Sequence, residues 1–222
     1  MGELSPGQAF MGAGELAHGE TPQEDERQFI RSRPPTASRA STSPTGRVHQ
    51  LDSVRNAGIQ FAWMKATEGT TYRDPNFNTN YPNAYYAGVI RGAYHFALPN
   101  SSSGATQANF FASNGGAWSA DNLTLPGVLD IESNPYGAQC YGLSTTQMRN
   151  WIQDFYNTYK SRTGRDVVIY TSPSWWNTCT GSWSGMASQS RCGSRTGPPP
   201  TARRCPAAST CTPSGSTPTP AR

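Results

Sequence analysis

Four short apolar runs divide the middle of this chain into repeating units, and a helix-like stretch separates each run from the next. The runs are IQFAWMK at 59–65, VIRGAYHF at 89–96, GVLDIE at 127–132 and DVVIYTSP at 166–173. The helix-like stretches are 78–88, 103–116 and 144–163. Successive runs start roughly 30 to 40 residues apart, which is the length of a strand, a crossover helix and their loops. This alternation predicts an α/β fold in which a parallel sheet is covered by helices.

The clearest helix is predicted from Ser144 to Thr163. Ser144 and Gln147 have the spacing of a capping box, in which each side chain satisfies the other residue's amide. One apolar face continues through the helix, formed by Met148, Trp151, Ile152, Phe155 and Tyr159. Gly164 ends the pattern.

Two carboxylates stand at the end of the third run, in the sequence LPGVLDIESNP. Asp130 and Glu132 are two residues apart, and on a strand such residues point to the same face. Like charges this close do not both ionise readily, so we expect one raised pKa. A protonated carboxylic acid beside an ionised carboxylate can cleave a glycosidic bond. The alternative is that both are solvated charges at a strand end.

Polar side chains also follow the other runs. Lys65 and Glu68 come after the first, Tyr94 and His95 end the second, and Tyr170 ends the fourth. The carboxyl ends of parallel strands meet at one edge of the sheet, where such folds place their sites. The sequence therefore predicts a catalytic site at this edge, with no phosphate-binding glycine loop.

Composition limits the kinds of partner and cofactor. The formal net charge of +4 arises from residues 191–222, which hold five arginines and no acidic residue, while 51–190 is neutral. No basic stripe interleaves with aromatic residues, and no apolar run of about 18 residues occurs. We expect no nucleic-acid partner, no membrane span, no cofactor and no metal.

Five cysteines occur, at 140, 179, 192, 205 and 211. Only Cys140 and Cys179 lie in the part with clear strand and helix patterns. They form either a disulfide, which implies an oxidising compartment, or two buried free thiols.

Several motifs resemble glycoside hydrolase family 25, the Chalaropsis-type lysozymes, and most of all its secreted Streptomyces members. They are FAWMKATEGTTYRDPNF, RGAYHFALP, LPGVLDIE and LSTTQMRNWIQDFYNTYKSRTGRDVVIYTSPSWWN, and the resemblance covers about residues 53–190. It implies an irregular parallel β/α barrel. The implied activity is that of a lysozyme (N-acetylmuramidase), which hydrolyses the β-1,4 bond between N-acetylmuramic acid and N-acetylglucosamine in peptidoglycan.

The resemblance also assigns residues. It implies that Glu132 is the general acid. Asp130 would orient the substrate's acetamido group or stabilise charge at the anomeric carbon. The other implied site residues are Glu68, Tyr94 and Tyr170, and the implied disulfide is Cys140–Cys179. We expect a secreted monomer whose partner is bacterial peptidoglycan, and a structural role for His95.

Two segments of the family pattern are missing, and a change of reading frame recovers them. Shifted by one base with suitable codons, 40–47 becomes GIDVSHWQ, 48–52 contains SINW, 191–197 becomes PLWVAHW, and 214–222 becomes FWQYSDTGT. We therefore divide the chain into an unstructured or frame-garbled leader (1–50), a partial catalytic domain (51–190) and a frame-garbled tail (191–222). A chain lacking these strands would expose sheet edges, so we expect it to fold poorly and to be inactive.

Two other functions compete with the muramidase. One is a non-catalytic peptidoglycan-binding domain, or a truncated inactive family member. The other is a barrel glycosidase that acts on chitin, although D-I-E differs from the longer acidic run of those enzymes.

Overall fold

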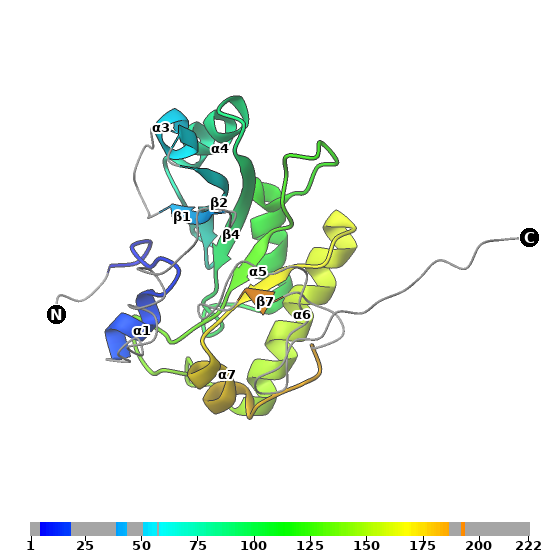
Figure 1. The fold of residues 1–222 in the computed structure, drawn as a ribbon. Helices are drawn as coiled ribbons and strands as arrows, with labels where there is room; N and C mark the ends of the chain where they lie inside the picture. Colours follow the sequence, from blue (N-terminus) through cyan, green and yellow to red (C-terminus); the bar gives the residue numbers. More distant parts are fainter. Residues whose placement is uncertain (1–4, 19–38, 44–50, 57, 187–191, 194–222) are drawn as a thin grey trace, which may run out of the picture.

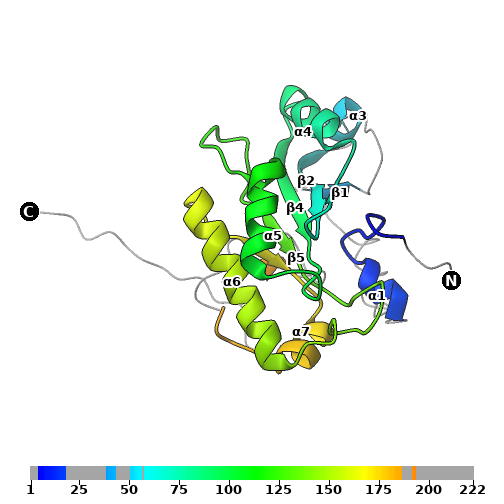
Figure 2. The same ribbon diagram turned by 180° about the vertical axis from the view of Figure 1, so that it is seen from behind.

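The computed structural model describes residues 5–18, 39–43, 51–56, 58–186 and 192–193 of the 222-residue chain. It contains one sheet with helices α5 and α6 lying together along one side of it (Figures 1 and 2). Among the described residues, no helix is both long and apolar enough to cross a membrane.

The sheet has seven strands, in the order β1-β2-β4-β5-β6-β7, with β3 paired to β2. All pairs are parallel except β2 with β3. The strands are β1 Arg39–Ser43, β2 Ile59–Glu68, β3 Tyr72–Arg73, β4 Ile90–Phe96, β5 Val128–Asp130, β6 Val168–Tyr170 and β7 Cys192–Gly193. The predicted α/β fold with a parallel sheet is therefore confirmed, and the four predicted strands are β2, β4, β5 and β6.

The helices lie between successive strands of the sheet, as the predicted alternation requires, except for α1, which precedes β1. They are α1 Ala13–His18, α3 Leu51–Asn56, α4 Phe77–Tyr86, α5 Gly104–Phe111, the π-helical turn η1 Ala112–Gly116, α6 Thr145–Thr163 and α7 Pro173–Thr180. Helix α6 agrees closely with its prediction. Ser144 and Gln147 form the complete capping box, and Gly164 ends the helix in the left-handed conformation.

Aromatic side chains fill the space between the sheet and helices α5 and α6. The ring of Phe155 on α6 stacks on those of Trp151, Tyr159 and Phe111, and His95 on β4 stacks on Phe155. Wide apolar rings packed this closely fix the helices relative to β4. This packing holds the carboxyl end of β4 in place, next to the end of β5.

The loop after β5 is tied to α7 by a disulfide. Cys140 in the loop and Cys179 on α7 are bonded, with their Cα atoms 5.3 Å apart. The predicted pairing is confirmed, and the alternative of two free thiols is wrong. The cross-link fixes the loop that follows Asp130 and Glu132.

Parts of the chain that we expected to be unstructured or lacking in strands are ordered. Residues 5–18 pack against the carboxyl edge of the sheet, and α1 lies beside the loop after β5 (Figures 1 and 2). Residues 39–43 form β1, parallel to β2, and 192–193 form β7, parallel to β6. The expectation that these end strands are absent is wrong, since pairing through main-chain groups does not depend on the side chains expected there. The rest of 1–50 and 191–222 lies outside the described residues.

Candidate active site

The register of the sheet brings three of the predicted site residues into one row, while Tyr94 lies two residues before the end of β4 and Glu132 follows β5. Glu68 on β2 pairs with Phe96 on β4, Phe96 pairs with Asp130 on β5, and Asp130 pairs with Tyr170 on β6. Each of them lies at the carboxyl end of its strand. The predicted convergence of these strand ends is therefore confirmed, since parallel strands bring their carboxyl ends to one edge.

Asp130 and Glu132 are both completely buried, with 0% of their surface exposed. Asp130 is the last residue of the short, fully buried β5, and Glu132 follows two residues later. The alternative that they are solvated charges at a strand end is thus wrong. A buried carboxylate needs hydrogen-bond donors, because burial without them is strongly unfavourable.

Main-chain amides from the start of the chain supply donors to Glu132. The amide of Gly12 donates to both carboxylate oxygens, at 2.8 Å to Oε1 and 3.0 Å to Oε2. The amide of Gly14 donates to Oε1 at 3.4 Å. The two oxygens of the predicted acid are therefore in contact with residues 118 and 120 positions away in sequence.

A buried ion pair stands beside these carboxylates. Lys65 Nζ lies 2.5 Å from Glu68 Oε2, and both side chains are almost completely buried. Burial lowers the pKa of Lys65, and the charge of Glu68 opposes this effect. The hydroxyl of Tyr136 donates to Glu68 Oε1 at 2.7 Å. The Glu68 carboxylate thus contacts Lys65 and Tyr136, and it also accepts from the Gly7 amide at 3.0 Å.

Tyr94 and Tyr141 are buried next to the acidic residues. Burial raises the pKa of the Tyr94 phenol well above its ordinary value, and the charge of Asp130 adds to this. Burial likewise raises the pKa of Tyr141, and the charges of Glu132 and Asp130 raise this pKa further. Both phenols therefore remain protonated and can act as hydrogen-bond donors near Asp130.

Tyr136 and Tyr141 were missed by the sequence-based interpretation. Both lie in the loop after β5, where neither helical nor strand periodicity exists.

Tyr170, which was predicted, is half-buried at the end of β6, and its carbonyl accepts from the Ile131 amide at 3.0 Å. That bond fixes the backbone between Asp130 and Glu132.

His95 is the residue before Phe96, and its buried ring belongs to a hydrogen-bonded network with Thr67 and Gln107. Its Nδ1 is 2.7 Å from the Thr67 hydroxyl, and its Nε2 is 2.9 Å from Gln107 Oε1. Burial lowers the pKa of His95 to about 4, although the bond to Gln107 acts in the opposite direction. A neutral ring with Nε2–H donating to Gln107 and Nδ1 accepting from Thr67 satisfies every partner. These contacts agree with the structural role expected for His95.

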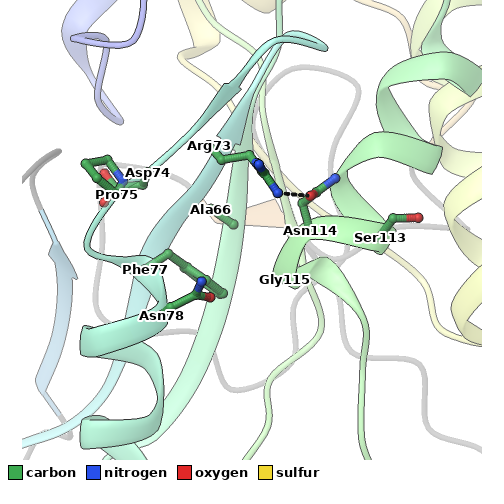
Figure 3. Close-up of a pocket in the computed structure, with 9 residues that line it drawn as sticks. All are labelled: Ala66, Arg73, Asp74, Pro75, Phe77, Asn78, Ser113, Asn114 and Gly115. Carbon is green, nitrogen blue, oxygen red and sulfur yellow. Dashed lines mark hydrogen bonds between the residues drawn. The ribbon is translucent and has the colours of Figure 1, made fainter.

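A cavity of about 490 Å³ lies elsewhere, between β2, the start of α4 and η1 (Figure 3). It is lined by Ala66, Arg73, Asp74, Pro75, Phe77, Asn78, Ser113, Asn114 and Gly115, and Arg73 donates to Asn114 across it. None of the predicted site residues lines this cavity. Within the described parts of the chain, no group of three or more acidic, histidine or cysteine side chains could hold a metal ion.

Comparison with known proteins decides the family. The profile described as "Glycosyl hydrolases family 25" matches residues 45–191. The chain belongs to this family. The match begins at residue 45 and ends at residue 191.

Solved and curated family 25 proteins resemble the chain over most of its length. The crystal structure of the bacterial lysozyme from Streptomyces coelicolor is 61% identical, with a TM-score of 0.70, over 72% of this chain and 75% of that one. A family GH25 lysozyme from Aspergillus fumigatus is 48% identical, with a TM-score of 0.69, over 74% of this chain and 79% of that one. The likeness to these structures gives the fold of this family 25 chain as the irregular β/α barrel of family 25 lysozymes.

Lysozyme M1 of Streptomyces globisporus is 58% identical over 189 residues, which are 85% of this chain and 64% of that protein. N,O-diacetylmuramidase of Chalaropsis is 48% identical over 57% of this chain and 61% of that protein. The chain thus spans less than two thirds of the length of these relatives. The 189 aligned residues are more than the chain contains from residue 45, where the family match begins, to its last residue. The similarity to Lysozyme M1 therefore extends into the part of the chain before the family match.

Proposed function

We propose that this family 25 chain is a lysozyme that hydrolyses the β-1,4 bond between N-acetylmuramic acid and N-acetylglucosamine in peptidoglycan. One observation carries the proposal: Asp130 and Glu132 are buried side chains at the carboxyl end of a central parallel strand. Glycosidic bond cleavage uses such a pair, in which one acid protonates the leaving oxygen.

The residues have separate roles in this proposal. Glu132 is the general acid that protonates the glycosidic oxygen. Asp130 orients the acetamido group of the substrate or stabilises positive charge at the anomeric carbon. Glu68, Tyr94 and Tyr170 bind the sugar, since they lie on the strands that flank β5 or one strand further.

Peptidoglycan lies outside the bacterial cytoplasm, so the proposed enzyme is secreted and acts there as a monomer. The Cys140–Cys179 disulfide supports this location, because structural disulfides persist in oxidising compartments. The proposal includes no cofactor, no nucleic-acid partner and no membrane partner.

Wall lysis with product analysis tests this function. Purified peptidoglycan is incubated with protein made from the resequenced gene and with its Glu132→Gln variant, which keeps the shape of the side chain but cannot donate an acidic proton. We expect clearing by the parent and a loss on the order of 10³-fold in the variant. New reducing ends are then reduced with borohydride and identified after acid hydrolysis. Muramic acid ends are expected; glucosamine ends or products from chitin would assign a different bond or substrate.

A non-catalytic peptidoglycan-binding domain is the second candidate, together with a truncated inactive family member. It predicts that wall fragments bind equally to the parent and to Glu132→Gln, with no new reducing ends from either. The buried carboxylate pair at the end of β5 favours the enzyme over this alternative, because a binding surface has no need of a buried acid.

We further propose that 40–50 and 191–222 are products of frame shifts, and that 51–190 is the catalytic domain of a protein with intact end strands. Resequencing the gene tests this. We expect shifted frames that encode the recovered family segments. One uninterrupted frame encoding ASTSPTGR and RCGSRTG would show that the chain has diverged instead.

A further inference from the structure

Residues 7–14, hereafter the amino-terminal segment, cover the catalytic edge of the sheet. We propose that this segment is autoinhibitory: it occupies the place in front of Glu132 that a polysaccharide must reach, and the enzyme acts only when it leaves. The inference rests on the proposed function, and its test is designed so that the two can fail separately.

The first observation is the contact with the general acid. Glu132 has no exposed surface, and both of its oxygens accept hydrogen bonds from the amide of Gly12. A general acid must approach the glycosidic oxygen within about 3 Å. When the segment is bound, the two carboxylate oxygens of Glu132 contact the main-chain amides of Gly12 and Gly14. These amides occupy the position that the glycosidic oxygen of a substrate would need.

The segment is held at a second point, on the buried ion pair. Gly7 donates its amide to Glu68 Oε1 at 3.0 Å, and its carbonyl accepts from Lys65 Nζ at 3.1 Å. The Ala9 carbonyl also accepts from Lys65 Nζ, and the Ala9 amide donates to the Tyr136 hydroxyl at 3.0 Å. The segment therefore satisfies polar groups of the three residues that lie beside the carboxylates.

Apolar contacts and small side chains complete the fit. Ala9 and Ala13 are buried against Phe96, the residue that pairs with Asp130 in the row of strand ends. A Cβ atom on Gly14 would lie only 1.8 Å from the carbonyl oxygen of Ser133. Gly12 adopts φ +96°, a conformation that other residues rarely take. The glycines at 12 and 14 are therefore needed for the segment to reach Glu132.

The segment contains no charged side chain and binds the site through its main chain and its alanines. It is thus attached by contacts that a few substitutions can break without touching a catalytic group. Gly14→Leu places a side chain where the Ser133 backbone already lies. Gly12→Pro removes the N–H group that donates to both oxygens of Glu132. Ser5→Leu is the matched control, because Ser5 is exposed and precedes the segment.

Two measurements are made on the full-length parent and on these variants. Hydrogen exchange of residues 7–14 reports whether the segment is bound, independently of any hydrolysis. Clearing of a peptidoglycan suspension reports activity. We expect both glycine variants to lose exchange protection and to clear walls at least roughly tenfold faster than the parent, since activity scales with the open fraction. Ser5→Leu should match the parent in both, and a synthetic peptide of residues 5–18 should slow Gly14→Leu again.

The outcomes separate the two proposals. Lost protection with an unchanged, measurable rate of clearing overturns autoinhibition and leaves the muramidase intact. Lost protection with no clearing and no new reducing ends by any form of the chain overturns the muramidase. Failure of the 5–18 peptide to slow Gly14→Leu also counts against autoinhibition. The use of two glycine variants at different positions guards against the misfolding of one.

Discussion

The main-chain nitrogen of Gly12 lies 2.8 Å from Oε1 and 3.0 Å from Oε2 of Glu132, although 120 residues separate them in sequence. This single donor joins the start of the chain to the residue that follows the central strand. The contact therefore has consequences that can be measured without substrate.

Glu132→Gln should weaken the binding of the amino-terminal segment. The variant keeps one oxygen that can accept, but its NH2 group cannot, so one of the two contacts with the Gly12 amide is lost, at a cost of roughly 1 kcal/mol of hydrogen-bond energy. We expect the amides of Gly12 and Gly14 to exchange with solvent about fivefold faster. Asp154→Asn is the control, since Asp154 Oδ2 accepts from the Ala105 amide at 2.7 Å at the start of α5. Its effect should be confined to that helix, and unchanged exchange at Gly12 in Glu132→Gln would contradict the expectation.

Removing Lys65 alone should destabilise the fold strongly. Lys65→Met leaves the buried Glu68 carboxylate without its cation, and such changes reduce the free energy of unfolding by about 3–5 kcal/mol. The double variant Lys65→Met with Glu68→Gln should be more stable than Lys65→Met, because it removes the buried charge as well. Denaturant unfolding of the parent, Lys65→Met, Glu68→Gln and the double variant gives the coupling free energy. Lys160→Met, in an exposed pair with Asp166, should change stability little, and an equal loss there would argue against the role of burial.

Stability should fall in mild acid because of His95. The folded state holds its pKa at about 4, against an ordinary value of 6.5. Between these pH values the unfolded chain binds more protons, so the free energy of unfolding decreases as pH drops from 6.5 to about 4. The total loss is about 3 kcal/mol, and none is expected above pH 6.5 from this group.

The His95→Gln variant isolates this effect, since Gln does not titrate. Unfolding in denaturant is measured at several pH values for both proteins. As pH drops from 6.5 to about 4, the free energy of unfolding of the parent should decrease relative to that of His95→Gln. A constant difference would mean that His95 is not buried as a neutral ring.

Reduction of the disulfide should lower the melting temperature. The bond between Cys140 and Cys179 closes a loop with a sequence separation of 39, and such a cross-link stabilises by about 3–4 kcal/mol. For a chain of this size, the expected decrease is roughly 10 °C. Melting is compared with and without reductant, and the Cys140→Ser with Cys179→Ser variant should not respond to reductant. A parent that melts at the same temperature in both conditions would contradict this.

Much of the fold and part of the site could be predicted because they depend on side-chain patterns. The capping box of Ser144 and Gln147 and the glycine after α6 are local signals, and the helix has the predicted bounds within one residue. The row through Glu68, Asp130 and Tyr170 follows from strand order alone, because parallel strands align their carboxyl ends.

The amino-terminal segment could not be predicted, for a physical reason. Gly7 and Gly12 bind through main-chain amides, which every residue has, so no side-chain pattern marks them. Tyr136 was missed because it lies in a loop without periodicity. The strands at 39–43 and 192–193 were missed because main-chain pairing to β2 and β6 places them, whatever their side chains.

The distance along the chain between Gly12 and Glu132 also sets an order of events during synthesis. The segment leaves the ribosome before its acceptor, which is made 120 residues later. At about 5–20 residues per second, that interval lasts roughly ten seconds, during which the segment has no partner. The proposed general acid and the segment that covers it are thus made in a fixed order, with the segment already present when Glu132 is made. In a newly made chain, the amino-terminal segment is therefore always present by the time that the site is complete.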